Sequence, residues 1–242
     1  MPATCLNDID VIILAGGFGT RLRSVFADRP KVLVPVNGVP FLRCFLEWLR
    51  GFGAQRIILS LGYQADLVQA YVKSEDWRGL ELESFVESTP LGTGGAVRAV
   101  LPLIRSGTAL VTNGDSLTRI ELCRFVEFHR RKNARLSMVL THQADVRQSG
   151  LVETAADDSV TSFAEKPQAN STGGYINAGL YLLQRDAIAE IPADRPVSIE
   201  RDVFPRFCGH GFFAMKGEFA FIDIGTPESY SRAGEFFRQE AA

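Results

Sequence analysis

The stretch IDVIILAGGFGTR, residues 9–21, decides the fold of this chain. Residues 9–14 form a short β-branched run, which is typical of a buried parallel strand. Glycines follow at once. They let the backbone approach a phosphate closely, and successive N–H groups can form a nest for an anion. The stretch therefore predicts a strand that ends in a phosphate-binding loop at the carboxyl edge of an open α/β sheet.

Strand-like and helical patterns alternate up to about residue 145. Strands are expected at 56–60, 80–86, 109–112 and 135–140, and helices at 41–49, 66–72, 95–104 and 120–132. This alternation predicts βαβ units and a mostly parallel sheet covered on both faces. Later, short strands are expected at 151–153, 160–164, 176–183 and 220–224, with helical pieces near 199–207 and 228–237.

The composition fits one α/β domain over residues 1–242, because 46% of the 242 residues are hydrophobic. A net charge of −2 gives no basic surface, so we expect neither a nucleic-acid nor a membrane partner. The first residues show no basic n-region and no long apolar run, which favours a cytoplasmic protein. The widely spread cysteines form no CxxC pair, so we expect reduced thiols rather than a zinc site or disulfide framework: Cys5, Cys44, Cys123 and Cys208. Nothing in the sequence indicates an oligomeric state.

Cations stand beside the glycine-rich turn. Arg21 follows it directly, and Arg29 and Lys31 come shortly afterwards. A triphosphate carries about four negative charges, and each pair of unit charges about 4 Å apart repels by roughly 4 kcal/mol at an effective dielectric near 20. Cations beside the turn would offset this repulsion.

Two other classes of glycine-rich loop fit the sequence poorly. The dinucleotide fingerprint needs a third glycine where Leu22 stands, and the P-loop ends in Gly-Lys-Ser/Thr, a triplet that does not occur.

GGFGTRL at residues 16–22, followed by Pro30 and Lys31, resembles the signature of the sugar-phosphate nucleotidyltransferase family. The resemblance implies a Rossmann-like three-layer α/β/α sandwich with a mixed, mostly parallel sheet. It also implies that Arg21 and Lys31 bind the triphosphate and the transition state, although Val32 replaces the proline that usually follows the lysine. The nucleotide-binding residues implied here are Leu14, Ala15, Gly16, Gly17, Gly19, Thr20, Arg21 and Lys31.

ESTPLGTGG, residues 87–95, reads as an ordinary strand-to-helix loop when taken alone. It also resembles the family's base-recognition loop, which implies that Glu87, Gly92 and Thr93 contact the nucleotide. A carboxylate can accept hydrogen bonds from both N1–H and N2–H₂ of guanine, whereas a glutamine suits uracil or thymine better. Glu87 therefore favours GTP.

Asp115 ends the triplet NGD, residues 113–115, and an aspartate in such a place is more often a helix cap or turn former. The resemblance instead makes Asp115 a catalytic residue that binds Mg²⁺. It gives the second metal ligand as Asp223, in DIGTPE at residues 223–228. One or two carboxylates with phosphate oxygens and water suit this ion.

EKP at residues 165–167 and NAG at residues 177–179 match the family's sugar-phosphate motifs. A surface Glu-Lys pair would otherwise be the default interpretation. The resemblance is weakest at Gly150, because the family has an aromatic residue directly before this glycine and this chain has Ser149. The sugar-phosphate residues implied in this way are Asn113, Gly150, Glu165, Lys166 and Asn177. We interpret His129, His142 and His210 as structural or solvated, and Trp48 and Trp77 as packing residues.

The family motifs run in order from about residue 11 to 230. They resemble most the D-glycero-α-D-manno-heptose 1-phosphate guanylyltransferases. This resemblance implies that the guanylyl group of GTP is transferred to that sugar phosphate and that pyrophosphate is released. Residues 1–145 would bind the nucleotide and 146–242 the sugar phosphate. Four alternatives stay open: a mannose-1-phosphate guanylyltransferase, a uridylyltransferase for a hexose or amino-sugar 1-phosphate, a nucleotide-sugar-binding regulator without activity, and an NAD-dependent dehydrogenase.

Overall fold

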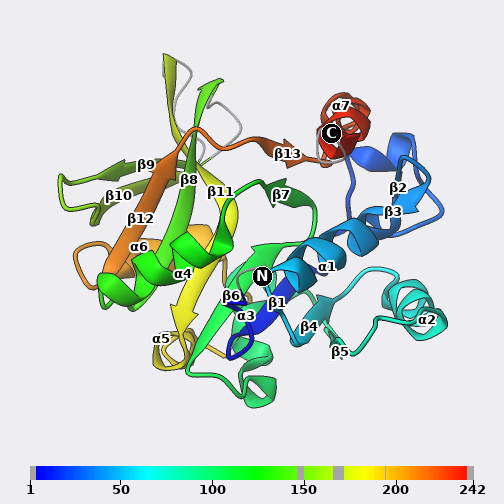
Figure 1. Cartoon of the computed structure of the whole chain (residues 1–242), viewed down its shortest axis with the longest axis horizontal. Coiled ribbons are helices and arrows are strands. Elements are labelled where there is room, and N and C mark those ends of the chain that lie inside the picture. The colour runs from blue at the N-terminus through cyan, green and yellow to red at the C-terminus, as the bar shows by residue number, and fades with distance from the viewer. Residues whose placement is uncertain (1–3, 146–149, 166–171, 194, 239–242) are drawn as a thin grey trace.

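A nine-stranded mixed sheet forms the centre of the computed structural model, which describes residues 4–145, 150–165, 172–193 and 195–238 (Figure 1). The strand order is β10-β9-β11-β6-β1-β4-β5, and β8 pairs with both β11 and β12. The strands of this sheet are β1 (Asp10–Ala15), β4 (Arg56–Leu61), β5 (Glu81–Val86), β6 (Thr108–Asn113), β8 (Leu136–Asp145), β9 (Gly150–Thr154), β10 (Val160–Glu165), β11 (Thr172–Gln184) and β12 (Phe212–Gly217).

The parallel part of the sheet aligns the carboxyl ends of four strands. In register, Ala15 of β1 lies beside Leu61 of β4, and Leu61 lies beside Val86 of β5. On the other side of β1, Leu14 lies beside Asn113 of β6. The glycine-rich turn, the loop that begins at Glu87 and the NGD triplet therefore leave the sheet at one edge.

Helices cover both faces, as the alternation predicted. The helices are α1 (Phe41–Gly51), α2 (Ala65–Ser74), α3 (Gly92–Ala99), α4 (Leu122–Arg131), α5 (Arg185–Ala189), α6 (Phe204–Phe207) and α7 (Pro227–Arg238). Val11 and Ile13 pack in one core with α1, α2, α4 and α7, whereas Ile12 packs in the other with α3, α5 and α6. This is a three-layer α/β/α sandwich. None of the described helices is long and apolar enough to cross a membrane.

Several elements differ from the sequence-based expectation. The helix expected at 95–104 begins earlier, at Gly92, and ends at Ala99, because Pro102 cannot donate a helical hydrogen bond and a short turn η3 (Leu101–Leu103) follows. The expected helical piece at 199–207 is a π-helix, η4 (Ile199–Val203), that continues into α6. Elements that the sequence did not predict are β12, α5, the hairpin of β2 (Pro35–Val36) and β3 (Val39–Pro40), β7 (Ser116–Thr118), and the turns η1 (Leu22–Ser24) and η2 (Lys31–Leu33).

The expectation of reduced thiols is wrong for two of the cysteines. Cys5 and Cys123 form a disulfide, with their Cα atoms 5.3 Å apart. Cys5 lies ahead of β1 and Cys123 lies in the first turn of α4, and residues next to each pack in the same core. Because 118 residues separate the two cysteines, no local spacing indicates the pair.

Candidate active site

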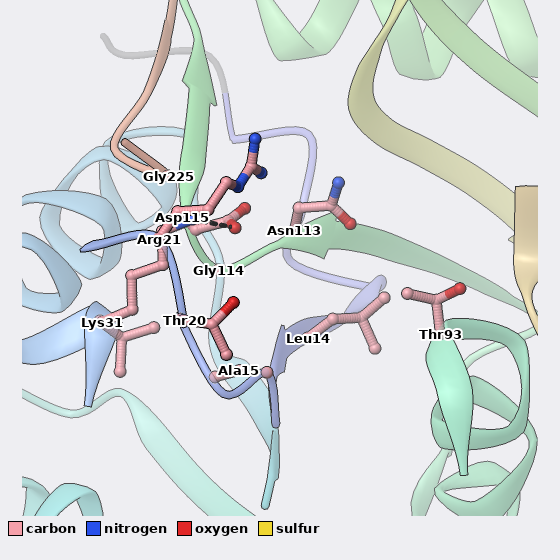
Figure 2. A pocket seen from close by; sticks show the side chains of 13 residues that line it. Leu14, Ala15, Thr20, Arg21, Lys31, Thr93, Asn113, Gly114, Asp115 and Gly225 are labelled. Atoms are coloured by element: carbon pink, nitrogen blue, oxygen red, sulfur yellow. Dashed lines mark hydrogen bonds and ion pairs between the residues drawn. The ribbon is translucent and has the colours of Figure 1, made fainter. Parts of the chain in front are cut away.

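A cavity of about 290 Å³ opens at the edge where the parallel strands end (Figure 2). It contains most of the predicted nucleotide-binding residues, together with Val32, Gly114 and Gly225, which the sequence did not indicate. The residues lining it are Leu14, Ala15, Gly17, Gly19, Thr20, Arg21, Lys31, Val32, Thr93, Asn113, Gly114, Asp115 and Gly225. Figure 2 shows Arg21, Lys31 and Asp115 together on one side, with Leu14 and Thr93 on the other.

The glycine-rich turn is shaped to bring the backbone close to the cations. Gly19 has a φ of +59°, a left-handed conformation that side chains other than glycine seldom adopt. A Cβ atom at Gly19 would lie 3.5 Å from the Cβ of Lys31, so Lys31 packs directly beneath the turn. The backbone N–H of Gly114 donates to the carbonyl oxygen of Leu14 at 2.9 Å, which ties the NGD triplet to the end of β1.

Lys31 lies between two acids. Its Nζ is 2.5 Å from Oδ2 of Asp115 and 3.6 Å from Oδ1 of Asp223. Burial, followed by repulsion from Asp115, raises the pKa of the Asp223 carboxyl, while the Lys31 ammonium group opposes that rise. One lysine thus offsets part of the repulsion between two neighbouring carboxylates, and Arg21 also opposes the rise in the pKa of Asp223.

A short antiparallel ribbon brings the two acids together. Strand β7 pairs with β13 (Phe221–Asp223), so that Asp223 lies opposite Ser116, the residue after Asp115. The backbone N–H of Ile224 donates to the carbonyl oxygen of Asp115 at 2.9 Å, which closes the ribbon at its end. The backbone N–H of Gly225 donates to the Asp223 carboxylate.

The carboxylate oxygens of Asp115 and Asp223 are the kind of ligand that a divalent cation such as Mg²⁺ prefers. Both side chains are 40% exposed beside the cavity, and their mutual repulsion is what a divalent ion would relieve. No cluster of three or more metal-ligating side chains occurs in the described part of the chain. A Mg²⁺ ion here would therefore take its remaining ligands from phosphate oxygens and water, as this ion commonly does.

Glu87 lies behind the glycine-rich turn rather than in the lining of the cavity. Its Oε2 accepts a hydrogen bond from the backbone N–H of Leu91 at 3.0 Å. Its Oε1 would be 3.1 Å from a Cβ atom placed on Gly16, so the carboxylate and the turn are in contact distance. Burial raises the pKa of the Glu87 carboxyl.

The predicted sugar-phosphate residues come from the antiparallel part of the sheet. Gly150 and Glu165 are directly opposite each other in the pairing of β9 with β10. Asn177, on β11, donates to the hydroxyl of Tyr181 at 2.8 Å and accepts from the backbone N–H of Gly179 at 2.9 Å. A register shift follows Asn177 in the pairing with β8. Of this group only Asn113 lines the cavity, and Lys166 lies outside the described residues.

The histidines are packed or solvated and the tryptophans pack, as expected: His142 contacts the ring of Tyr175 edge-on, and His210 is exposed. His129 is buried, and its Nδ1 is 2.8 Å from the Ser137 hydroxyl oxygen. Trp48 stacks on Phe45, with ring centroids 5.7 Å apart. Trp77 donates its Nε1–H to a backbone carbonyl oxygen of α2 at 2.8 Å.

Comparison with known proteins shows the family. The family model described as nucleotidyl transferase matches residues 10–240. Mannose-1-phosphate guanylyltransferase from Mycobacterium tuberculosis is 36% identical over 229 residues, which are 93% of this chain and 64% of that protein's length. D-glycero-alpha-D-manno-heptose 1-phosphate guanylyltransferase from Campylobacter jejuni is 33% identical over 222 residues, covering 92% of this chain and 97% of that protein. The crystal structure of HddC from Yersinia pseudotuberculosis complexed with GMP-PN aligns with a TM-score of 0.83 at 38% identity, covering 95% of this chain and 99% of that one. The chain belongs to the nucleotidyl transferase family.

Proposed function

We propose that the chain joins GTP to a sugar 1-phosphate, D-glycero-α-D-manno-heptose 1-phosphate, and releases pyrophosphate. One observation carries the proposal: the side chains of four charged residues lie together beside the glycine-rich turn. These residues are Arg21, Lys31, Asp115 and Asp223. The guanylyltransferase relatives support the reaction class. The membership of this chain in the nucleotidyl transferase family also argues against an NAD-dependent dehydrogenase. We place the reaction in the cytoplasm.

The reaction needs charge compensation more than acid–base chemistry. An oxygen of the sugar phosphate attacks the α-phosphorus in line, a new P–O bond forms, and the bond to the leaving pyrophosphate breaks. The nucleophile is already an anion, so no strong general base is needed. Arg21 and Lys31 lie where they can offset charge on the transferring and leaving groups.

Asp115 and Asp223 are the residues that would hold Mg²⁺. When bound, the ion neutralises charge on the phosphate oxygens. Lys31 bridges the same two carboxylates, and its position lowers the cost of keeping both ionised. The catalytic group of this proposal is therefore Arg21, Lys31 and Asp115, with Asp223 as the second metal ligand.

The two halves of the chain divide the substrates in this proposal. Residues 1–145 bind the nucleotide, through the glycine-rich turn and the loop of Glu87, Gly92 and Thr93. The Glu87 carboxylate, which lies against Gly16 beside the cavity, is assigned to the guanine edge. Residues 146–242 bind the sugar phosphate, and the residues assigned to it are Asn113 from the first half with Gly150, Glu165, Lys166 and Asn177 from the second.

Mannose 1-phosphate is the second candidate for the sugar. It is favoured by the 36% identity to the mycobacterial protein, of which this chain spans 64%. Heptose 1-phosphate is preferred because the D-glycero-alpha-D-manno-heptose 1-phosphate guanylyltransferases from Campylobacter jejuni and Aneurinibacillus thermoaerophilus are matched over 97% and 96% of their length.

A pyrophosphate-release matrix tests the proposal. GTP, UTP, dTTP, CTP and ATP are each combined with heptose, mannose, glucose and N-acetylglucosamine 1-phosphates in the presence of Mg²⁺. The expected maximum is at GTP with the heptose phosphate. A maximum at mannose 1-phosphate would replace the sugar, a strong UTP signal would refute the use of Glu87, and silence throughout would favour a non-catalytic regulator.

Arg21→Ala and Asp115→Ala test the assigned residues. Each should lower kcat by about 10²-fold or more without unfolding the protein, because each removes a charge that acts on the transition state. Arg130→Ala is the matched control, since Arg130 forms an exposed ion pair with Asp8 outside the cavity. Near wild-type turnover in either site variant would contradict the assignment.

A further inference from the structure

A segment from the second half of the chain is bonded to the loop that precedes and opens α3. The backbone N–H groups of Gly94 and Gly95 both donate to the carbonyl oxygen of Val197, at 2.8 and 3.1 Å. In return, the N–H of Val197 donates to the carbonyl oxygen of Leu91 at 2.8 Å. Gly92 has a φ of +73°, and a Cβ atom there would be 2.6 Å from the Val197 oxygen. The two backbones therefore meet with no room for a side chain between them.

Side chains extend this junction to the cavity. The hydroxyl of Thr93 donates to Oε2 of Glu200 at 2.8 Å and accepts from the backbone N–H of Ile199 at 2.9 Å. The hydroxyl of Ser198 donates to the same Glu200 oxygen at 2.8 Å. Thr93 is the one residue of this junction that lines the cavity among the described residues. Its hydroxyl is thus engaged on the side away from the cavity.

The orientation of Thr93 leaves its methyl group for the cavity. Figure 2 shows the methyl carbon on the side of Leu14 and the hydroxyl oxygen on the opposite side. Leu14 and Thr93 both line the cavity, so an aliphatic side chain and a methyl group contribute apolar surface to it. Attraction between a nucleoside and this apolar surface weakens quickly when either side chain moves, because dispersion contacts fall off steeply with distance.

We propose that Glu200 is a positioning residue of the nucleotide pocket. By holding the Thr93 hydroxyl, it directs the Thr93 methyl to the side of Leu14, and hence sets the shape of the slot that takes the nucleoside. The inference rests on the proposed function, in which this cavity binds the nucleotide. It also makes the nucleotide slot dependent on a residue from the half of the chain assigned to the sugar phosphate.

A carboxylate suits this role. Oε2 of Glu200 accepts two hydroxyl donors at once, and hydrogen bonds to an ionised acceptor are shorter and stronger than neutral ones. The Ser198 hydroxyl also accepts from the backbone N–H of Arg201 at 3.2 Å, as a cap for η4. The first turn of the π-helix therefore holds the Glu200 side chain in the position from which it accepts the Thr93 hydroxyl.

Binding of a non-hydrolysable GTP analogue tests the proposal by calorimetry. Glu200→Ala should raise the Kd of the analogue by about tenfold, the effect of losing one hydrogen bond to a charged group. Glu200→Gln should stay within a few-fold of wild type, because an amide oxygen can accept the same two bonds. Thr93→Val keeps the shape but removes the hydroxyl, and should resemble Glu200→Ala. The control is Glu190→Ala, which breaks an ion pair with Arg135 outside this cavity.

A variant that carries both Thr93→Val and Glu200→Ala shows whether Glu200 positions Thr93 or only stabilises the fold. If Glu200 acts through Thr93, Thr93→Val combined with Glu200→Ala should raise Kd no further than the larger single change. Multiplied effects in the double variant, or an unchanged Kd with a lowered Tm in Glu200→Ala, would overturn the proposal. Failure of the proposed function is distinguishable, because it would show as silence of the wild-type protein in the pyrophosphate matrix, whereas this readout is binding alone.

Discussion

Acid should destabilise this protein through one buried histidine. His129 of α4 is 2% exposed, and its Nε2 lies 3.3 Å from the amide nitrogen of Gln184. Because an amide N–H donates, Nε2 is the acceptor, and Nδ1–H donates to the Ser137 hydroxyl. The ring is neutral in this arrangement. Burial, with a contribution from Arg130, lowers the pKa of His129 from 6.5 to about 4.

The size of the effect follows from proton linkage. The unfolded chain binds the proton near pH 6.5 and the folded chain only near pH 4, so acid favours unfolding. The stabilisation is complete above pH 6.5 and is lost as the pH falls towards 4. Between pH 7.5 and 4.5 the free energy of unfolding should fall by about 2.5 kcal/mol. Against a typical total of about 5–15 kcal/mol, this is a large fraction.

Urea unfolding at several pH values, followed by the fluorescence of Trp48 and Trp77, measures this loss. His129→Gln cannot titrate, so its free energy of unfolding should start lower at pH 7.5 but decline much less towards pH 4.5. The exposed His210 provides the control, since His210→Gln should keep the wild-type decline. Equal declines in wild type and His129→Gln would refute the reasoning.

Three further predictions concern the site. Lys31→Met should lower kcat by about 10²–10³-fold, and because Lys31 holds down the pKa of Asp223, the residual activity should be lost at a higher pH on acidification than in wild type, which pH–rate profiles measure. Gly92→Ala should lower Tm and raise the KM for GTP, because the new Cβ would be 2.6 Å from a backbone oxygen; Gly79→Ala, with a φ of +85° and open space around it, controls for the left-handed conformation alone. Glu87→Gln should lower kcat/KM for GTP relative to UTP in the same pyrophosphate assay, and an unchanged ratio would remove Glu87 from base selection.

Local patterns predicted much of the fold and much of the cavity. The β-branched run of β1 and its glycine-rich turn needed only neighbours in sequence, and so did the amphipathic spacing of α1 and α4. Because parallel strands end at one edge, the glycine-rich turn and the NGD triplet were expected there together, whereas the place of Lys31 was implied only by the family resemblance.

Features that depend on distant residues could not be predicted in this way. Strand β7 has three residues, too few for periodicity to register, and its pairing with β13, which lies at the expected strand 220–224, joins distant parts of the chain. The contact of Glu200 with Thr93 joins parts of the chain 107 residues apart and carries no motif. The disulfide of Cys5 with Cys123 was missed for the same reason.

The β7–β13 ribbon has a consequence for the order in which the protein is made. Asp115, Arg21 and Lys31 are all translated before the first half is complete, but Asp223 enters the ribbon only after the whole central sheet has been synthesised. A nascent chain stalled after β7 would already hold the glycine-rich turn and the loop of Glu87, yet it would carry a single acid beside Lys31. With Asp223 as the second metal ligand of the proposed function, catalytic competence should therefore arise only late in translation, when β13 pairs with β7.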